Sequence, residues 1–402
     1  MYLYIMSENK FVFFGCWNSL NENSNLENTM NMLKTHLTAN PEISFVVIGG
    51  DNFYPDKSKK KEQKEDKKKE KDKDKDKKEK KDKEEKQQDI CTKIINLDKL
   101  TRGFDFLPKD IEIYMLLGNH DLETNIGNEQ KFCIQHGEDL IEEPSNTCTI
   151  LQHEKHLVSS NKNITLGTNF VRVLNNTLLL MIDTSMYDTA ESESYVPCYN
   201  NYYNSNVNIE ELRSTQNGWI TQNIQNHDGI KNIIIMGHHP ITGFKVKKDE
   251  CILTELQQPF IDMWKSILQI IPSQINISYL CADIHNYQES IVVFNSHLKK
   301  PIHQYIVGTG GTELDAKKHI NCPERIFSNT RDDIITYILK TQLNAEHGVL
   351  DCDCSGEKPL FTFISTDKSF AGGKKKRKTN KRKTKKRKMG TKKIKFKKYR
   401  QV

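Results

Sequence analysis

The sequence predicts an α/β fold in which helices cover a largely parallel sheet. An apolar run at 11–14, a stretch with helical spacing at 26–37 and a second apolar run at 43–48 follow one another. This order and spacing is that of a β-α-β unit, which lays two parallel strands side by side. Several apolar runs also end abruptly in polar side chains, as strands do where α/β proteins carry their chemistry.

In the first half of the chain, three buried strands are predicted. They lie at 11–14, 43–48 and 111–117, and the third is broken at Gly118, because glycine interrupts an apolar strand pattern. Residues 122–170 show no clear periodicity, and we expect them to be rich in loops.

In the second half, helices and strands continue to alternate. A segment rich in Tyr, Asn and Ser at 186–210 is predicted to be a long surface loop. Helices are predicted at 212–224 and 260–271, where apolar residues recur at helical spacing. Apolar runs predict further strands at 177–184, 233–236, 275–280, 290–295 and 304–307.

Two charged segments are predicted to be disordered. Residues 57–88 hold 17 Lys against 11 Asp or Glu, and residues 374–402 hold 18 Lys or Arg with no acidic residue. The formal net charge of +7 therefore comes from these segments, and the remaining body is acidic. We expect one domain at 8–330, with the insert inside it, followed by a C-terminal extension at 331–370 and a polybasic tail at 371–402.

The polybasic tail has three interpretations. It could bind nucleic acid or another polyanion through counterion release, it could be a nuclear localisation signal, or it could merely keep the protein soluble. Phe396 and Tyr399 are its only aromatic residues, so reading of single-stranded sequence is not implied.

The cysteines and the N-terminus predict an intracellular protein of the cytoplasm or nucleus. The ten cysteines form no C-x-x-C pair, and Met1 to Lys10 lack the pattern of a signal peptide. No run approaches the roughly 18 apolar residues of a membrane span. We therefore expect no membrane span and mostly reduced thiols. The abundance of Lys, Asn and Ile suggests an AT-rich genome, such as that of a protist or a large DNA virus.

Four predicted strands end in side chains that can bind metals. Parallel strands bring such ends to one edge of a sheet, where their ligand atoms can converge. Mixed carboxylate, amide and imidazole ligands suit Fe, Zn or Mn, and this many ligands suits two ions rather than one. The pairs are Asp51 with Tyr54, Asn119 with His120, His238 with His239, and Asp283 with His285.

These motifs resemble those of the calcineurin-like metallophosphoesterases, and within them the purple (tartrate-resistant) acid phosphatase branch. The resemblance covers roughly residues 11–325 and implies a four-layer fold, a two-sheet β-sandwich flanked by helices. The motifs that carry it are Gly50-Asp51-Asn52-Phe53-Tyr54, Gly118-Asn119-His120-Asp121, Ile182-Asp183-Thr184, Gln216 to Trp219, and Gly237-His238-His239-Pro240.

The resemblance also implies a role for each matching residue. In such enzymes two metal ions lie about 3.5–4 Å apart and hold the attacking and leaving oxygens. Catalytic roles fall to His120, which would bind the phosphate and assist the leaving group, and to Asp121, which would orient His120. The implied metal ligands are Asp51 bridging both ions, Tyr54 and His285 on the first, and Asn119 and His238 on the second.

Two positions depart from the family pattern. Cys16 stands where a metal-binding aspartate belongs, and it is either a ligand that favours Zn or an inert buried thiol. Asp283 stands where the last motif has its first histidine, and we expect it to be a substitute ligand. His239 is expected to be a packing residue rather than a ligand.

The sequence therefore predicts hydrolysis of a phosphomonoester through attack by a metal-bound hydroxide at a dinuclear site. One alternative is a phosphodiesterase or nuclease that uses the same site. The other is a catalytically impaired pseudophosphatase that binds polyanions or partners, for which Cys16 and Asp283 are the basis.

Overall fold

The computed structural model describes most of the chain between residues 9 and 369. Residues 57–88 and 371–402 were predicted to be disordered. Apart from Lys57, they lie outside the described residues. The described residues are 9–21, 24–57, 91–124, 131–137, 139–248, 250–295, 299–315, 321–329, 334–341 and 344–369.

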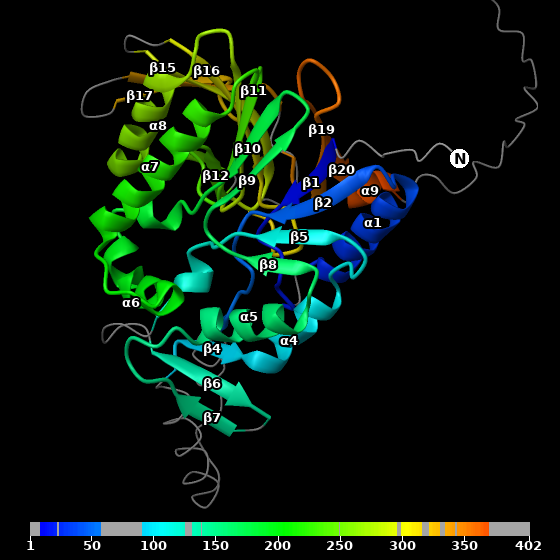
Figure 1. Ribbon diagram of the computed structural model, residues 1–402. Helices are drawn as coiled ribbons and strands as arrows, with labels where there is room; N and C mark the ends of the chain where they lie inside the picture. The colour runs from blue at the N-terminus through cyan, green and yellow to red at the C-terminus, as the bar shows by residue number, and fades with distance from the viewer. Residues whose placement is uncertain are drawn as a thin grey trace, which may run out of the picture.

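Two β-sheets face each other, and helices cover their outer faces, which confirms the predicted α/β sandwich (Figure 1). The first sheet has the order β20-β19-β1-β2-β5-β8. Its strands are β1 (Lys10–Phe14), β2 (Ile43–Ile48), β5 (Glu112–Met115), β8 (Ile164–Leu166), β19 (Gly348–Asp353) and β20 (Leu360–Ser365).

The second sheet has the order β17-β18-β15-β16-β14-β11-β10-β9. In both sheets the central strands are parallel, namely β1-β2-β5 and β10-β11-β14-β16. The strands of the second sheet are β9 (Phe170–Leu174), β10 (Thr177–Met181), β11 (Asn232–Met236), β14 (Asn276–Cys281), β15 (Tyr287–Phe294), β16 (Pro301–Val307), β17 (Arg325–Asn329) and β18 (Ile334–Leu339).

Alternate side chains of β10 face two different layers. Leu179 and Met181 belong to the core between the two sheets, whereas Leu178 and Leu180 pack in a second core with Trp264 of the helical layer. Because successive side chains point to opposite faces, a strand covered on both sides becomes a continuous apolar run. This is why the apolar runs of the sequence located the central strands correctly.

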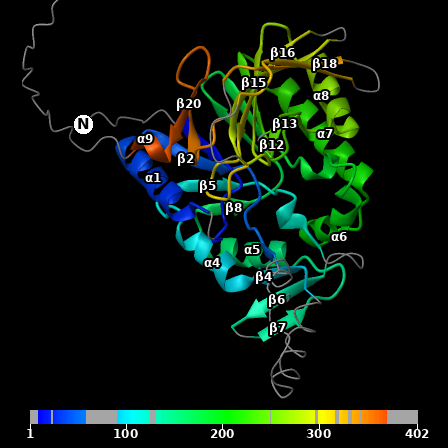
Figure 2. The same ribbon diagram turned by 180° about the vertical axis from the view of Figure 1, so that it is seen from behind.

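The helices form two outer layers. α7 and α8 cover the second sheet, while α1 and α9 lie on the side of the first sheet (Figures 1 and 2). The helices are α1 (Leu26–Ala39), α4 (Leu97–Asp105), α5 (Thr149–Ser160), α6 (Ser192–Tyr203), α7 (Ile209–Asn226), α8 (Gln258–Ile270) and α9 (Thr366–Ser369). Among the described residues, no helix has the length and apolar character needed to cross a membrane.

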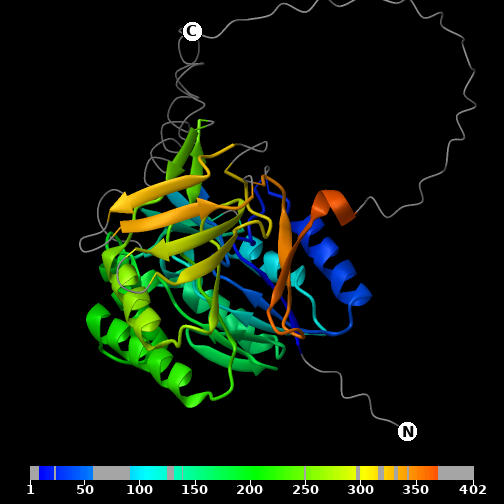
Figure 3. The same ribbon diagram turned by 90° about the horizontal axis from the view of Figure 1, so that it is seen from above.

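Strands beyond residue 330 belong to both sheets. β19 pairs antiparallel with β1, with Phe13 opposite Leu350, and β18 pairs antiparallel with β15. In Figure 3 the short α9 that follows β20 lies beside α1. The predicted C-terminal extension therefore contributes strands to both sheets of the sandwich.

Residues 122–170 hold more regular structure than expected. A small sheet of order β3-β4-β6-β7 contains two strands from this region, and α5 and β8 follow. Its strands β4 and β6 are parallel neighbours from distant parts of the chain, a pairing that no local pattern reveals. The strands are β3 (Asp56–Lys57), β4 (Lys93–Asn96), β6 (Phe132–His136) and β7 (Asp139–Glu142).

The prediction of a long surface loop at 186–210 is wrong, because α6 occupies Ser192–Tyr203. Tyr, Asn and Ser are poor helix formers, and Pro197 lies inside the helix, so local preference argued against it. Tyr195 and Tyr199 are almost fully buried, and packing of these rings outweighs the weak local preference.

The prediction of mostly reduced thiols is also wrong. Disulfides join Cys91 to Cys133, Cys148 to Cys198 and Cys251 to Cys322. The unpaired cysteines, all buried, are Cys16, Cys281, Cys352 and Cys354. Disulfides are rare in reducing compartments. The intracellular location was predicted partly from reduced thiols, and these disulfides weigh against that reason.

Candidate metal centre

Three candidate ligands lie in turns directly after strands. Cys16 follows β1, Asp51 follows β2 and Asp283 follows β14, with φ angles of 54°, 55° and 51°. Residues other than glycine seldom adopt this left-handed region, and such strained positions cluster at functional sites. The three matching turns thus mark one edge of the sandwich as the candidate site.

The turn after β5 approaches Asp51 closely. A Cβ atom at Gly118 would lie 2.3 Å from the backbone nitrogen and Oδ1 of Asp51. Only glycine therefore lets these two turns pack, and it brings the neighbouring Asn119 and His120 to the site. The backbone N–H of His120 donates to Asp51 Oδ1 at 3.1 Å.

A first ligand group consists of Cys16, Asp51 and His285, whose ligand atoms lie within 4.8 Å of one another. Tyr54 joins this group, because its hydroxyl donates to Asp51 Oδ2 at 2.7 Å and lies 3.0 Å from His285 Nε2. The structure thus brings together the four residues predicted for the first ion.

A second ligand group consists of His238, His239 and Asp283, also within 4.8 Å of one another. Its His238 Nε2 lies 3.1 Å from Asn119 Oδ1 and 3.1 Å from Asp51 Oδ1. The predicted ligands of the second ion are therefore adjacent, and Asp51 touches both groups, as a bridging ligand must.

The two predicted histidine ligands have the orientation that metal binding requires. His238 Nδ1 is 2.7 Å from the carbonyl oxygen of Gly49, and His285 Nδ1 is 2.9 Å from that of Glu313. A carbonyl only accepts, so each Nδ1 carries a hydrogen and each Nε2 is the ring nitrogen that faces the site. Although burial opposes it, Asp51 raises the pKa of His238 to about 9, so a cation would have to displace the hydrogen on His238 Nε2. Around His238 Nε2 the neighbouring atoms are oxygens of Asp51 and Asn119, a set of donors that suits a cation.

His239 differs from His238 in this respect. The hydroxyl oxygen of Thr184 accepts hydrogen bonds from the backbone N–H groups of His238 and His239. The same oxygen lies 3.1 Å from His239 Nδ1. With its own hydrogen, that hydroxyl donates to Nδ1, so Nε2 carries the ring hydrogen. His239 is a weak ligand in this arrangement, in keeping with the packing role expected for it.

The carboxylate of Asp51 remains ionised. Burial disfavours the charged form, but the imidazoles of His238 and His120 and the Tyr54 hydroxyl outweigh it and hold the pKa of Asp51 well below its usual range. Asp51 therefore supplies a permanent negative charge where the two ligand groups meet.

Cys16 has the opposite behaviour. Burial, with the negative charge of Asp51 adding to it, raises the pKa of the Cys16 thiol well above its usual value. Its Sγ lies 3.9 Å from Asp51 Oδ2. A cation would have to displace the thiol proton before Cys16 could act as a ligand.

Glu123 lies at the candidate site, although none of the motifs in the sequence includes it. Its Oε1 lies 2.6 Å from Nδ1 of His120, and its Oε2 accepts from Lys93 at 2.5 Å. Although burial opposes protonation of His120, Asp51 and Glu123 raise its pKa to about 9. The spacing of three residues within one turn is the signal that could have revealed this pair.

Asp121 does not take the predicted place beside His120. It accepts from the backbone N–H groups of Gly118 and Asn52 at 2.7 Å each, and from the Asn52 side chain at 2.8 Å. These bonds join the turn after β5 to the turn after β2. The carboxylate in contact with the His120 ring is that of Glu123, so the expected orienting contact of Asp121 is replaced.

A pocket of about 460 Å³ opens beside the second ligand group. Asn119, His239 and Asp283 line it together with Lys245, whose ammonium lies 3.2 Å from Asp283 Oδ2. Thr184, Tyr187, Ile252 and Phe260 also line it. The pocket therefore opens onto the second ligand group.

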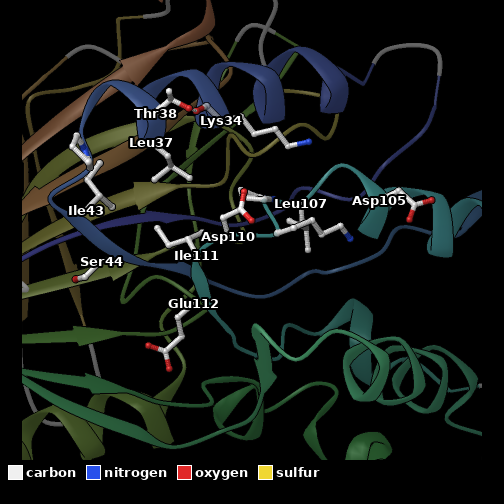
Figure 4. Close-up of a pocket in the computed structure, with 13 residues that line it drawn as sticks. Lys34, Leu37, Thr38, Ile43, Ser44, Asp105, Leu107, Asp110, Ile111 and Glu112 are labelled. Carbon is white, nitrogen blue, oxygen red and sulfur yellow. Dashed lines mark hydrogen bonds between the residues drawn. The ribbon is translucent and has the colours of Figure 1, made fainter.

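A larger cavity of about 640 Å³ lies away from the centre, between α1 and residues 105–112 (Figure 4). Leu37, Leu107 and Ile111 line it, with Asp105 and Glu112 among the charged residues there. It shares no residue with either ligand group.

Two facing sheets whose parallel strands present paired histidine and carboxylate ligands are the framework of a metal-dependent hydrolase. The chain belongs to the calcineurin-like phosphoesterase family, whose model matches residues 9–264, more than half of the sequence. No curated protein and no solved structure matches the chain.

Family membership makes this protein, in general terms, a phosphoesterase-type hydrolase. Members of the family generally bind divalent metals, and this chain has candidate ligand groups for them. The candidate centre extends past the matched region, because Asp283 and His285 follow residue 264.

Proposed function

We propose that this protein is a phosphomonoesterase that works with two metal ions bound between its sheets. The observation that carries the proposal is the contact of Asp51 with both ligand groups. A resemblance of Gly50 to Tyr54 to the acid phosphatase branch supports the monoester substrate, and Tyr54 lies against Asp51 as that resemblance implies.

Each ion would be held by residues of both sheets. Cys16, Tyr54 and His285 would hold the first ion, Asn119, His238 and Asp283 the second, and Asp51 both. The mixture of sulfur, nitrogen and oxygen ligands suits Zn, Fe or Mn, with the thiol favouring Zn. When bound, such ions neutralise phosphate charge and lower the pKa of water toward about 7.

His120 would protonate the leaving group. Its ring lies 4.7 Å from that of Tyr54, measured between centroids, which places it beside the first ligand group. The nearby carboxylates of Asp51 and Glu123 keep the imidazole protonated at neutral pH. A positioned imidazolium can give its proton to the ester oxygen as the bond to phosphorus breaks. Asp121 would act through the backbone, by fixing the turns that carry Asp51 and His120.

The test is a comparison of two ester classes. The full chain, loaded with Zn²⁺ or Mn²⁺, should release nitrophenol from 4-nitrophenyl phosphate and lose this activity after chelation. Activity that prefers bis(4-nitrophenyl) phosphate would favour a phosphodiesterase or nuclease instead. His120→Asn should lower turnover by about 100-fold or more if the imidazole is the acid, without loss of the bound ions.

A second candidate function follows from Cys16. Because its buried thiol is difficult to ionise, the first ligand group could be too weak to support turnover, and the protein would then be a pseudophosphatase. Metal content and turnover measured on one sample separate the two functions. Two ions with turnover support the enzyme, and an ion-free, inactive chain supports the pseudophosphatase.

The tail supports a further proposal about partners. Its 18 Lys or Arg at 374–402 would bind nucleic acid or another polyanion in either case. Affinity of the full chain for a duplex DNA should fall steeply with salt, and a chain that ends at residue 370 should lose it.

A further inference from the structure

Lys245 is a fixed positive charge beside the second ligand group. Its Nζ lies 3.2 Å from Oδ2 of Asp283, and both residues line the pocket that opens from this group. Among the described residues, no other lysine forms a salt bridge with a candidate metal ligand. Asp283 is also the position where the family pattern has a neutral histidine.

The backbone next to Lys245 is held rigidly. Phe244 is fully buried, its N–H donates to Gln288 Oε1 at 3.0 Å, and its carbonyl accepts from Gln288 Nε2 at 2.9 Å. Lys245 lies on β12 (Phe244–Lys247), which pairs with β13 (Glu250–Leu253) in a hairpin labelled in Figure 2. The disulfide Cys251–Cys322 ties this hairpin to a distant segment. The lysine is thus held at the site by the fold.

The charges of Asp283 and Lys245 cancel. An aspartate in place of histidine adds one negative charge to the second ligand group and would by itself strengthen cation binding. The ammonium removes that gain, because it neutralises one carboxylate oxygen and repels an incoming cation at short range. In the part of the chain that the structure describes, no lysine or arginine forms a salt bridge with Cys16, Asp51 or His285, although the charge of Lys245 also acts on Cys16.

We propose that Lys245 keeps the second ligand group at low affinity for metal and supplies part of the positive charge there itself. The protein then holds an ion at Cys16, Asp51 and His285 more tightly than a second ion at the other ligand group. This inference rests on the proposed metal-dependent function, and it assigns Lys245 as a positioning residue that sets metal stoichiometry.

The experiment measures bound metal rather than activity. Chelator-treated full-length protein is titrated with Zn²⁺ by calorimetry, and its metal content is measured by elemental analysis after dialysis. The variants are Lys245→Met, which removes the charge, and Lys245→Arg, which keeps it. Lys247→Met is the matched control, because it is an exposed lysine on the same face of the same strand, two residues further on.

We expect wild type, Lys245→Arg and Lys247→Met to bind one Zn²⁺ more tightly than the second. Lys245→Met should bind the second Zn²⁺ about tenfold more tightly or better, because the repulsion is gone. Two equally tight ions in wild type and in Lys245→Met would overturn the inference and leave the proposed function intact. The absence of bound metal from every form would overturn both. Lys245 is half-exposed, so thermal unfolding is expected to show each variant folded.

Discussion

The two ligand groups of the candidate centre are built from similar residues in different surroundings. In the first group Cys16 and Asp51 are fully buried, and a tyrosine hydroxyl closes the gap between Asp51 and His285. The second group borders the pocket and carries the ammonium of Lys245. Ligand residues alone therefore do not define a metal site, since burial and neighbouring charge decide how strongly each group binds.

The largest effect should come from the residue that the two groups share. Asp51→Asn removes the ionised carboxylate between them, so both ions and more than about 100-fold of turnover should be lost. Elemental analysis and phosphate release on one sample measure this. Asp188→Asn serves as the control, since Asp188 lines the pocket without belonging to a ligand group. If only one ion leaves, Asp51 is not shared.

Changing Cys16 should sharpen the contrast between the groups. Cys16→Asp replaces a thiol of raised pKa with a carboxylate, and aspartate tolerates the φ of 54° at this turn better than cysteine does. Affinity of the first group for Zn²⁺ or Mn²⁺ should rise about tenfold. Cys16→Ser is the matched variant, because it removes the sulfur without adding charge. Weaker binding by the aspartate variant would contradict this prediction.

Glu123 should control the pH range of activity. In the proposed mechanism His120 acts in its protonated form, which is present below its pKa of about 9. Removing the Glu123 charge in Glu123→Gln lowers this pKa, so the alkaline limb of kcat/KM should move down by about one pH unit. The same change at Glu112, an exposed carboxylate on β5, should leave the profile in place. An unmoved limb in Glu123→Gln would mean that His120 does not supply the proton.

The smallest effect is expected at His239. Because Thr184 fixes its ring so that Nε2 carries hydrogen, His239→Asn should change Zn²⁺ affinity by less than about threefold. The same substitution at His238 should abolish binding at the second group. Calorimetric titration of both variants provides the measurement, and equal losses would make His239 a ligand after all.

The sequence predicted the parts of the fold that depend on buried strands. Runs such as 43–48 and 233–236 are apolar on both faces, because each strand is covered by a sheet on one side and by helices on the other. Chain segments that are stabilised by contacts with distant residues were harder to predict from the sequence. α6 depends on the burial of tyrosines, and β4 pairs with β6 across a long stretch of chain.

The candidate site was predicted in the same uneven way. Residues in strand-end motifs, such as Asp51 and His238, lie where the pattern suggested. Lys245 could not be found, since 38 positions of sequence separate it from Asp283 and no motif contains it. Asp121 alone was predicted to orient His120, because only the geometry shows that the ring contacts Glu123 instead.

The pairing of β1 with β19 has a consequence for synthesis of the protein. β1 carries Cys16 at its end, yet its antiparallel neighbour is made more than three hundred residues later. On the ribosome, the edge of the first sheet stays open until Gly348–Asp353 emerges, which exposes an apolar strand to wrong partners during that time. The candidate ligands, the last of which is His285, are therefore all synthesised before β1 acquires its antiparallel neighbour.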